Sequence, residues 1–353
     1  MVYDAVGIHE SVKGQGHWPE TDQTPTLTLF LENLEDRSLR RVKQLGVTGV
    51  SMSGLGTGGI ETWTDAALKR NIDRAAEAGL ELRNIMFELS DRIRFGEPGR
   101  DEDIETVISA IQVAGRQGLP VMEYNFYAHR IVEGYKVVPG RGGSGLMDFN
   151  DDRIKDLPPL AGQTAHSLDE MWDNVTYYLE AVIPAAEEAN VRLALHPNDP
   201  PAPISRGSGQ IMSTVEGWKK LVDIVPSPYN GITFDCGVTR ELGHDPVEIC
   251  RYFGERDQIN HVHFRNVVSR VPNLDYTEVW IDEGHVDMFA VMSELVRQKY
   301  PRLIYPEHPP QNDSDTEFPF DGISATTYTG FAYTVGYARA MMQAALATQA
   351  ANR

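Results

Sequence analysis

Four side chains that could bind a metal ion stand at the ends of four consecutive segments that the sequence predicts as strands. They are His196 after VRLAL, Cys236 after GITFD, His263 in INHVHF and Glu307 in RLIYPEHP. A lone histidine or cysteine at such a place is more often structural. Two imidazoles, a thiolate and a carboxylate on successive strands, however, suit a divalent transition ion. The thiolate argues against magnesium alone, while manganese, iron, cobalt and zinc remain open.

Further polar side chains follow two of these strands. Asn198 and Asp199 lie in HPNDPPAP, where the prolines stiffen the chain and would hold both residues over a cavity as substrate contacts. Arg265 and Asn266 come directly after His263 in HVHFRNV. At a strand mouth, an arginine is well placed to pair with a substrate carboxylate. His261 is two residues before His263, and we expect one of the two to face the barrel interior.

The pair Glu307–His308 needs a local explanation, because successive side chains of a regular strand point to opposite faces. Pro306 and Pro309 flank the pair and bias PEHP away from a regular ladder. Both residues can then serve one site. We expect Glu307 to bind the metal and His308 to face the substrate at the rim.

The elements that position these residues alternate between short apolar runs and amphipathic segments. Candidate strands are 3–8, 47–53, 80–89, 120–127, 191–197, 231–237, 259–267 and 302–309, and candidate helices are 34–46, 64–79, 101–118, 167–190, 214–225, 245–254, 287–300 and one from about Tyr328. Eight such pairs predict a single (β/α)8 TIM barrel over residues 1–353, in which the carboxyl ends of the strands meet at one face. The connection 130–166 contains GRGGSG and is long enough to form a lid.

Composition limits the partners and the compartment. The 353 residues include 51 acidic and 32 basic ones, a net charge of −19, which disfavours nucleic acid and anionic membranes as partners. The first residues lack the pattern of a signal peptide and no apolar run is long enough to span a membrane. Two cysteines provide no disulfide framework. We expect a cytoplasmic enzyme that acts on a small molecule and forms a homo-oligomer.

Several sequence blocks together resemble the mannonate dehydratase family. They are LHPNDPP (195–201), NGITFDCG (230–237), HFRNV (263–267) and GHVDM (284–288), with weaker matches in QLGVTGV (44–50), AGLELRNI (78–85) and LPVMEYNF (119–126). The order and spacing of these blocks match over most of the chain. The resemblance implies a lyase that removes water from D-mannonate, or a related aldonate, to give 2-keto-3-deoxy-D-gluconate.

The resemblance also implies a ligand set and two acid/base groups. In that family two His, one Cys and one Asp hold a divalent metal, usually manganese; these correspond here to His196, Cys236, His263 and Glu307. His308 would be one acid/base group and Tyr328 the other. Related barrels give a second hypothesis, a metal-dependent sugar isomerase, epimerase or β-eliminating lyase. A third hypothesis is a sugar-acid-binding protein without catalysis.

The chain departs from the family pattern mainly around the substrate. Glu307 replaces an aspartate, and the second strand ends in SMSG (51–54), where the family carries histidines. Ile281 stands where a histidine is expected, and Tyr328 is displaced by about one turn. These departures predict that the metal site is kept while the sugar acid that is bound has changed.

Overall fold

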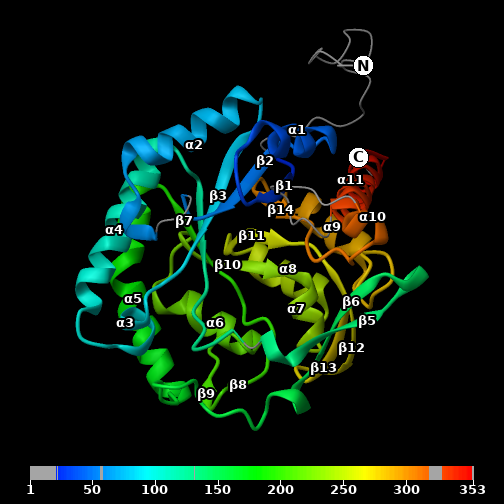
Figure 1. Ribbon diagram of the computed structural model, residues 1–353. Coiled ribbons are helices and arrows are strands. Elements are labelled where there is room, and N and C mark those ends of the chain that lie inside the picture. Colours follow the sequence, from blue (N-terminus) through cyan, green and yellow to red (C-terminus); the bar gives the residue numbers. More distant parts are fainter. Residues whose placement is uncertain (1–20, 22, 56–58, 131, 318–327, 352–353) are drawn as a thin grey trace.

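The centre of the protein is a closed barrel of eight parallel strands, seen in a computed structural model that describes residues 21, 23–55, 59–130, 132–317 and 328–351 (Figure 1). Around the barrel the order is β1 (Thr26–Leu31), β14 (Leu303–Tyr305), β11 (Ile259–His263), β10 (Asn230–Asp235), β7 (Arg192–Leu195), β4 (Val121–Tyr124), β3 (Glu81–Phe87) and β2 (Gly49–Ser53). Pairing of β1 with both β14 and β2 closes the ring. The predicted fold class is thereby confirmed.

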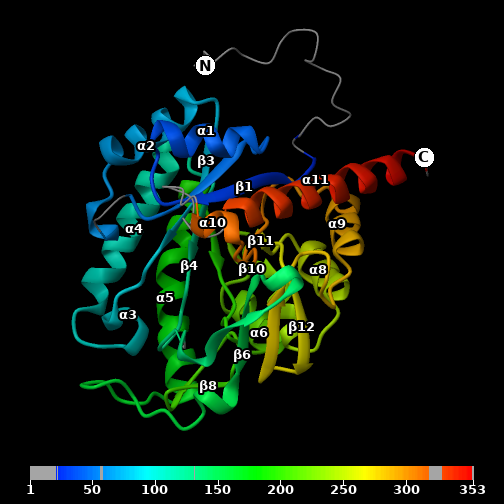
Figure 2. The same ribbon diagram turned by 45° about the vertical axis from the view of Figure 1, so that its right-hand side comes forward.

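Eight longer helices alternate with these strands and surround the barrel in both views (Figures 1 and 2). They are α1 (Asp36–Gln44), α2 (Asp65–Glu77), α4 (Arg100–Gln117), α5 (Leu168–Ala189), α6 (Val215–Ile224), α8 (Pro246–Gly254), α9 (Met288–Arg297) and α11 (Tyr328–Ala351). Local sequence fixes several starts: the side chains of Thr64, Thr214 and Asp287 accept hydrogen bonds from backbone N–H groups of the first turn. None of the helices in the described residues is long and apolar enough to cross a membrane.

One predicted barrel strand was wrong. The segment 3–8 lies outside the described residues, and the strand that precedes α1 is β1, with the sequence TLTLFL. Two threonines alternate with apolar residues in this segment, so its sequence does not read as a continuous apolar run typical of a buried strand. The structure explains them: Thr26 and Thr28 are both buried, and the Thr28 hydroxyl donates to the backbone oxygen of Ile304 at 3.2 Å.

The long connection 130–166 contains regular structure. It forms a hairpin of β5 (Tyr135–Pro139) and β6 (Gly145–Asn150), which joins β12 (Asn266–Val271) and β13 (Asp275–Val279) in a four-stranded antiparallel sheet. This accessory sheet packs on the barrel through β12 and α7 (Cys236–Glu241). An isolated bridge between Gly145 and Gln311 links the hairpin to the segment after β14. The hairpin therefore belongs to the mouth of the barrel.

The remaining elements are short connections. They are β8 (Ile204–Ser205), β9 (Ser208–Gly209), α3 (Asp91–Phe95), α10 (Asp313–Glu317), and the 3-10 turns η1 (Ile60–Thr62), η2 (Val132–Gly134), η3 (Arg141–Gly143) and η4 (Asp151–Arg153). The β8–β9 hairpin lies at the end of the molecule opposite α11 (Figures 1 and 2). Both cysteines are buried and free, as the absence of a disulfide framework predicts.

Candidate metal centre and active site

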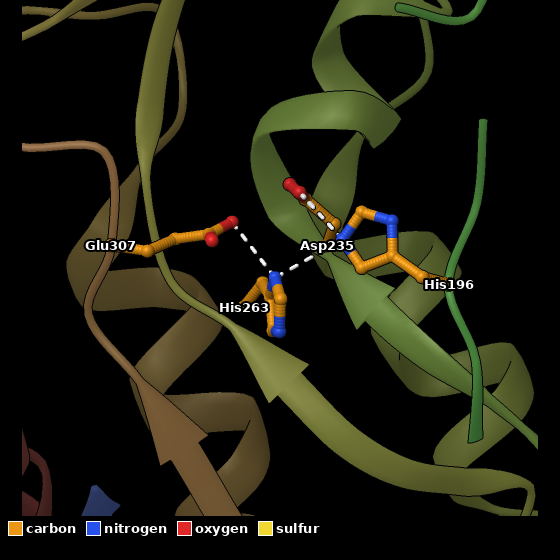
Figure 3. A group of neighbouring side chains, drawn as sticks. All are labelled: His196, Asp235, His263 and Glu307. Atoms are coloured by element: carbon orange, nitrogen blue, oxygen red, sulfur yellow. Dashed lines mark hydrogen bonds and ion pairs between the residues drawn. The ribbon is translucent and has the colours of Figure 1, made fainter. Parts of the chain in front are cut away.

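Four buried side chains converge where the barrel strands end (Figure 3). His196 directly follows β7, Asp235 ends β10, His263 ends β11 and Glu307 follows β14 by two residues. One ligand atom from each lies within 4.8 Å of the other three. Three of the four predicted ligands thus meet, and Asp235 joins them. Buried groups of this type can hold a divalent metal ion.

His196 is held in the tautomer that a metal ligand needs. Its Nδ1 lies 2.7 Å from the backbone oxygen of Pro197. A carbonyl oxygen only accepts, so Nδ1 carries the proton and the lone pair of Nε2 faces the cluster. The Tyr127 hydroxyl donates to the same oxygen at 2.8 Å and fixes it in place. Burial, helped by the charge of His263, lowers the pKa of His196 to about 4, which keeps the ring neutral.

The ring of His263 is oriented by the buried carboxylate of Glu123 on β4, on the side of the ring away from the other metal ligands. Its Nε2 lies 3.1 Å from Oε1 of Glu123, while its Nδ1 lies 3.1 Å from His196 Nε2 and 2.8 Å from Glu307 Oε1. The other oxygen of Glu123 is 3.1 Å from His261 Nδ1. Both histidines therefore face the barrel interior, as residues two apart on a strand do, and the expectation that only one would was wrong. A carboxylate behind an imidazole is the usual partner of a metal-bound histidine.

Glu123 also accepts hydrogen bonds from two uncharged side chains. The Asn84 amide donates to it at 3.0 Å and the Thr233 hydroxyl at 2.8 Å. The group Glu123, His261 and His263 also has metal-ligand spacing. Because donors already surround the carboxylate, this group is better described as a hydrogen-bond network beneath the metal centre than as a second metal site.

Asp235 and Cys236 are adjacent but engaged differently. Asp235 Oδ1 accepts from the backbone N–H of Val238 at 2.8 Å and caps α7, and Oδ2 accepts from Arg265 Nε at 2.9 Å. The Cys236 thiol donates to the backbone oxygens of His263 and Arg265, both at 3.3 Å. Its Sγ stays outside the four-residue group, although it lies against the end of β11. Burial raises the pKa of this thiol, so the metal-free protein keeps it protonated.

The chain leaves strand geometry before Glu307, because β14 ends at Tyr305. His308 adopts a left-handed backbone conformation with φ of 47°, and this turn brings both neighbouring side chains to the same site. Glu307 is buried beside His263, whereas His308 is partly exposed and its Nδ1 lies 2.9 Å from Glu278 Oε2 on β13. Burial alone would lower the pKa of His308, but Glu278 and Glu307 raise it to about 9. The imidazole is therefore protonated at neutral pH.

Arg265 occupies the middle of an acidic cluster rather than an open rim. It is only 1% exposed. Its guanidinium lies between 2.7 and 3.9 Å from five carboxylates, those of Asp199, Asp235, Glu241, Glu278 and Glu307. This burial contradicts the prediction that it pairs with a substrate carboxylate, since three of its N–H groups already donate to Asp235, Glu241 and Asp199.

A pocket of about 400 Å³ adjoins the metal group, a suitable size for a small ligand. Its wall includes Asp199, Glu278 and His308, with Arg130 and Tyr135 from the long connection. The Tyr135 hydroxyl donates to Asp199 Oδ1 at 2.6 Å. Although burial opposes it, Arg265 lowers the pKa of Asp199 and keeps this carboxylate ionised. Polar groups from the barrel and from the accessory sheet therefore face one cavity.

Three predicted site residues have structural contacts instead. Asn198 bonds Gln210 and the backbone N–H of Met212, and so fastens the loop after β7. The Asn266 amide donates to the backbone oxygens of Ile281 and Val286 and accepts from the Val286 N–H. Tyr328 directs its hydroxyl to the backbone oxygen of Arg41 on α1, at 3.4 Å. The structure does not bring these three side chains to the metal group.

Several acidic residues of the site were not predicted from the sequence, namely Glu123, Asp235, Glu241 and Glu278. Glu123 offered a signal, because it interrupts the apolar run VMEY of a strand that is buried throughout. Asp235 offered another, since it precedes Cys236 at the same strand end. Glu241 and Glu278 resemble any solvated acidic residue in the sequence, and only the folded chain brings them to Arg265.

Comparison with known proteins agrees with this architecture. The family profile of D-mannonate dehydratase (UxuA) matches residues 26–162 and 152–351. The mannonate dehydratase of Thermotoga maritima is 30% identical over 312 residues, which cover 77% of this chain and 85% of the relative. That of Streptococcus equi subsp. zooepidemicus is 29% identical over 267 residues, 68% of this chain and 72% of the relative.

Solved structures show the same fold. The mannonate dehydratase of Streptococcus suis serotype 2 superposes with a TM-score of 0.82 at 24% identity, over 92% of this chain and 96% of that one. A xylose isomerase domain protein from Planctomyces limnophilus gives a TM-score of 0.57 at 12% identity, over 91% and 97% of the two chains. At 24% and 12% identity these two structures show the fold alone, whereas the family profile spans nearly all of the described residues. The chain belongs to the D-mannonate dehydratase family.

Proposed function

We propose that this protein is a metal-dependent hydro-lyase that converts D-mannonate, or a closely related aldonate, to the 2-keto-3-deoxy acid and water. The observation that carries the proposal is the convergence of two histidines, His196 and His263, and the carboxylate of Glu307 beside a pocket whose wall holds a protonated histidine, His308. The family membership supports the same reaction. The cytoplasmic location and a homo-oligomeric state, expected from the sequence, stay predictions.

The proposed ligands are His196, His263, Glu307 and Cys236, and the proposed metal is Mn²⁺. Both oxygens of Asp235 already have partners, in the cap of α7 and in Arg265, so this residue is the less available fourth ligand. Cys236 has only weak thiol bonds to backbone oxygens, and a bound cation would replace the thiol proton. When bound, the metal supplies positive charge that stabilises the anion formed at the carbon next to the carboxylate.

His308 is the proposed proton donor to the leaving hydroxyl group. Its Nδ1 is held by Glu278, so Nε2 is the atom that can donate into the pocket. Nε2 is 3.5 Å from Glu307 Oε2, close enough for the two residues to act on the same substrate. Glu278 orients the ring and favours its protonated form. Tyr328 has no part in this proposal, since its hydroxyl contacts α1.

Product analysis on a substrate panel tests the function. The purified protein, loaded with Mn²⁺, is given D-mannonate, other aldonates, uronates and ketoses, and the products are identified by NMR. We expect a 2-keto-3-deoxy acid from at least one aldonate, and loss of this activity with a chelator. Epimerised or isomerised ketoses with no dehydration would favour the isomerase hypothesis instead. Binding of an aldonate without turnover would favour the binding protein.

A further inference from the structure

The carboxylate of a sugar acid needs a cationic side chain in the pocket, and Arg265, the residue expected from the sequence, is already bound by carboxylates of the protein. Arg265 is buried among five carboxylates. His308 is paired with Glu278 and Glu307. Besides the proposed metal ion and His308, an anionic ligand that enters beside Asp199 and Glu278 needs a positive group whose donors are free to bind its carboxylate.

We propose that Arg130 is the residue that binds the carboxylate of the sugar acid and so selects acids over neutral sugars. Arg130 lines the same pocket as Asp199, Glu278 and His308. It follows β4, at the mouth of the barrel and just before the hairpin β5–β6. This inference rests on the proposed function, because it assumes that the ligand is a sugar acid.

The contacts of Arg130 set it apart from the other cations of the site. Within the described part of the chain its guanidinium forms no ion pair or side-chain hydrogen bond, although the charge of Asp199 in the same pocket acts on it, and its backbone oxygen accepts from the N–H of Val132. An arginine that lines a polar pocket with a free planar guanidinium can bind a carboxylate through two parallel N–H groups. If Arg130 is instead a solvated surface arginine, its replacement should not change the affinity for the ligand.

Arg141 provides a matched control. It lies on η3 in the same hairpin region and carries the same charge, but its guanidinium is already bound to Asp282 at 2.9 Å and packs 4.8 Å from the ring of Trp280. Replacing either arginine by glutamine removes one positive charge. Of the two arginines, only Arg130 lines the pocket.

The experiment measures affinity and catalysis on the Mn²⁺-loaded protein and on the variants Arg130→Gln, Arg130→Lys and Arg141→Gln. Calorimetry uses the product 2-keto-3-deoxy-D-gluconate, which keeps the carboxylate and is not consumed. We expect Arg130→Gln to weaken product binding about 10- to 100-fold and to raise KM for D-mannonate more than it lowers kcat. Arg130→Lys should recover part of the loss, and Arg141→Gln should bind as the wild type does.

The possible failures are distinguishable. Equal product affinity for the wild type and Arg130→Gln, with unchanged thermal unfolding, would overturn the assignment of Arg130 and leave the dehydratase proposal intact. An equal loss in Arg141→Gln would also overturn it, because a general charge effect would then explain both. A wild-type protein that binds and dehydrates no sugar acid would refute the proposed function, and the role of Arg130 with it.

Discussion

Replacing Glu123 by Gln tests whether the network beneath the metal centre tunes the metal site. Glu123 is completely buried, and its carboxylate faces His263 Nε2 and His261 Nδ1 at 3.1 Å each. Glutamine keeps the shape but loses the charge and offers one acceptor in place of two. The ring of His263 would then be held less firmly, with a less basic Nδ1.

The expected loss can be estimated from this geometry. Removing the outer partner of a metal-bound histidine typically weakens metal binding about 10- to 100-fold, which corresponds to about 1.4 to 2.7 kcal/mol. At saturating Mn²⁺, the stabilisation that the metal adds to unfolding should fall by the same amount. The metal-free variant should also unfold more easily, because Asn84 and Thr233 compete for the single remaining oxygen.

Two measurements separate these effects. Free Mn²⁺ is followed by EPR during titration to give the affinity, and unfolding is measured with and without the metal. Glu294→Gln is the matched control: Glu294 is a buried carboxylate on α9 that accepts from Arg297 and Gln298, away from the metal group. It should lose stability but keep Mn²⁺ affinity. An affinity of Glu123→Gln within twofold of the wild type would refute the role given to this carboxylate.

Three further predictions concern the ligands and the proton donor. Cys236→Ser should weaken Mn²⁺ binding without unfolding the barrel, and the Co²⁺-loaded wild type should show a thiolate charge-transfer band. If this band is absent and only Asp235→Asn loses the metal, Asp235 is the fourth ligand instead. His308→Asn should keep the metal but lose most turnover, whereas Glu307→Gln should lose both; full turnover in His308→Asn would remove the proposed acid. In the metal-free protein the His308 ring should titrate by NMR near pH 9 because, although burial lowers its pKa, Glu278 and Glu307 raise it from 6.5 to about 9. In Glu278→Gln the ring should titrate at lower pH, because one of the two glutamates no longer carries a charge. Since the folded pKa is the higher one, this pair stabilises the fold below about pH 6.5 and the contribution is lost as pH rises through 9; an unchanged titration in the variant would contradict the ion pair.

Much of the fold could be predicted because hydrophobic periodicity and strand-end chemistry reinforce each other. The predicted strand 231–237 corresponds to β10 (Asn230–Asp235), and the predicted helix 167–190 to α5 (Leu168–Ala189). Barrel closure then brings successive strand ends together, which is why His196, His263 and Glu307 meet. No knowledge of side-chain packing was needed for this step.

The remainder depended on contacts between distant segments. Arg265 was predicted as a substrate ligand from its place at a strand mouth, but Glu241 on α7 accepts a hydrogen bond from it and Glu278 on β13 lies 3.9 Å from it. Asn266 was misassigned for the same reason, since its partners lie 15 and 20 residues further along the chain. A sequence shows which groups can bind a ligand, but not which groups are already bound by the protein itself.

The arrangement separates the metal site from the part of the pocket that contacts the substrate. The metal group comes from β7, β10, β11 and the segment after β14, whose positions are fixed by the barrel. Tyr135 and Glu278 come from the accessory sheet, which the hairpin β5–β6 joins at its edge. Substitutions in this sheet can therefore change the shape and polarity of the pocket without moving a metal ligand. We therefore expect substitutions in the hairpin β5–β6 to change which sugar acid is bound while the metal site is kept.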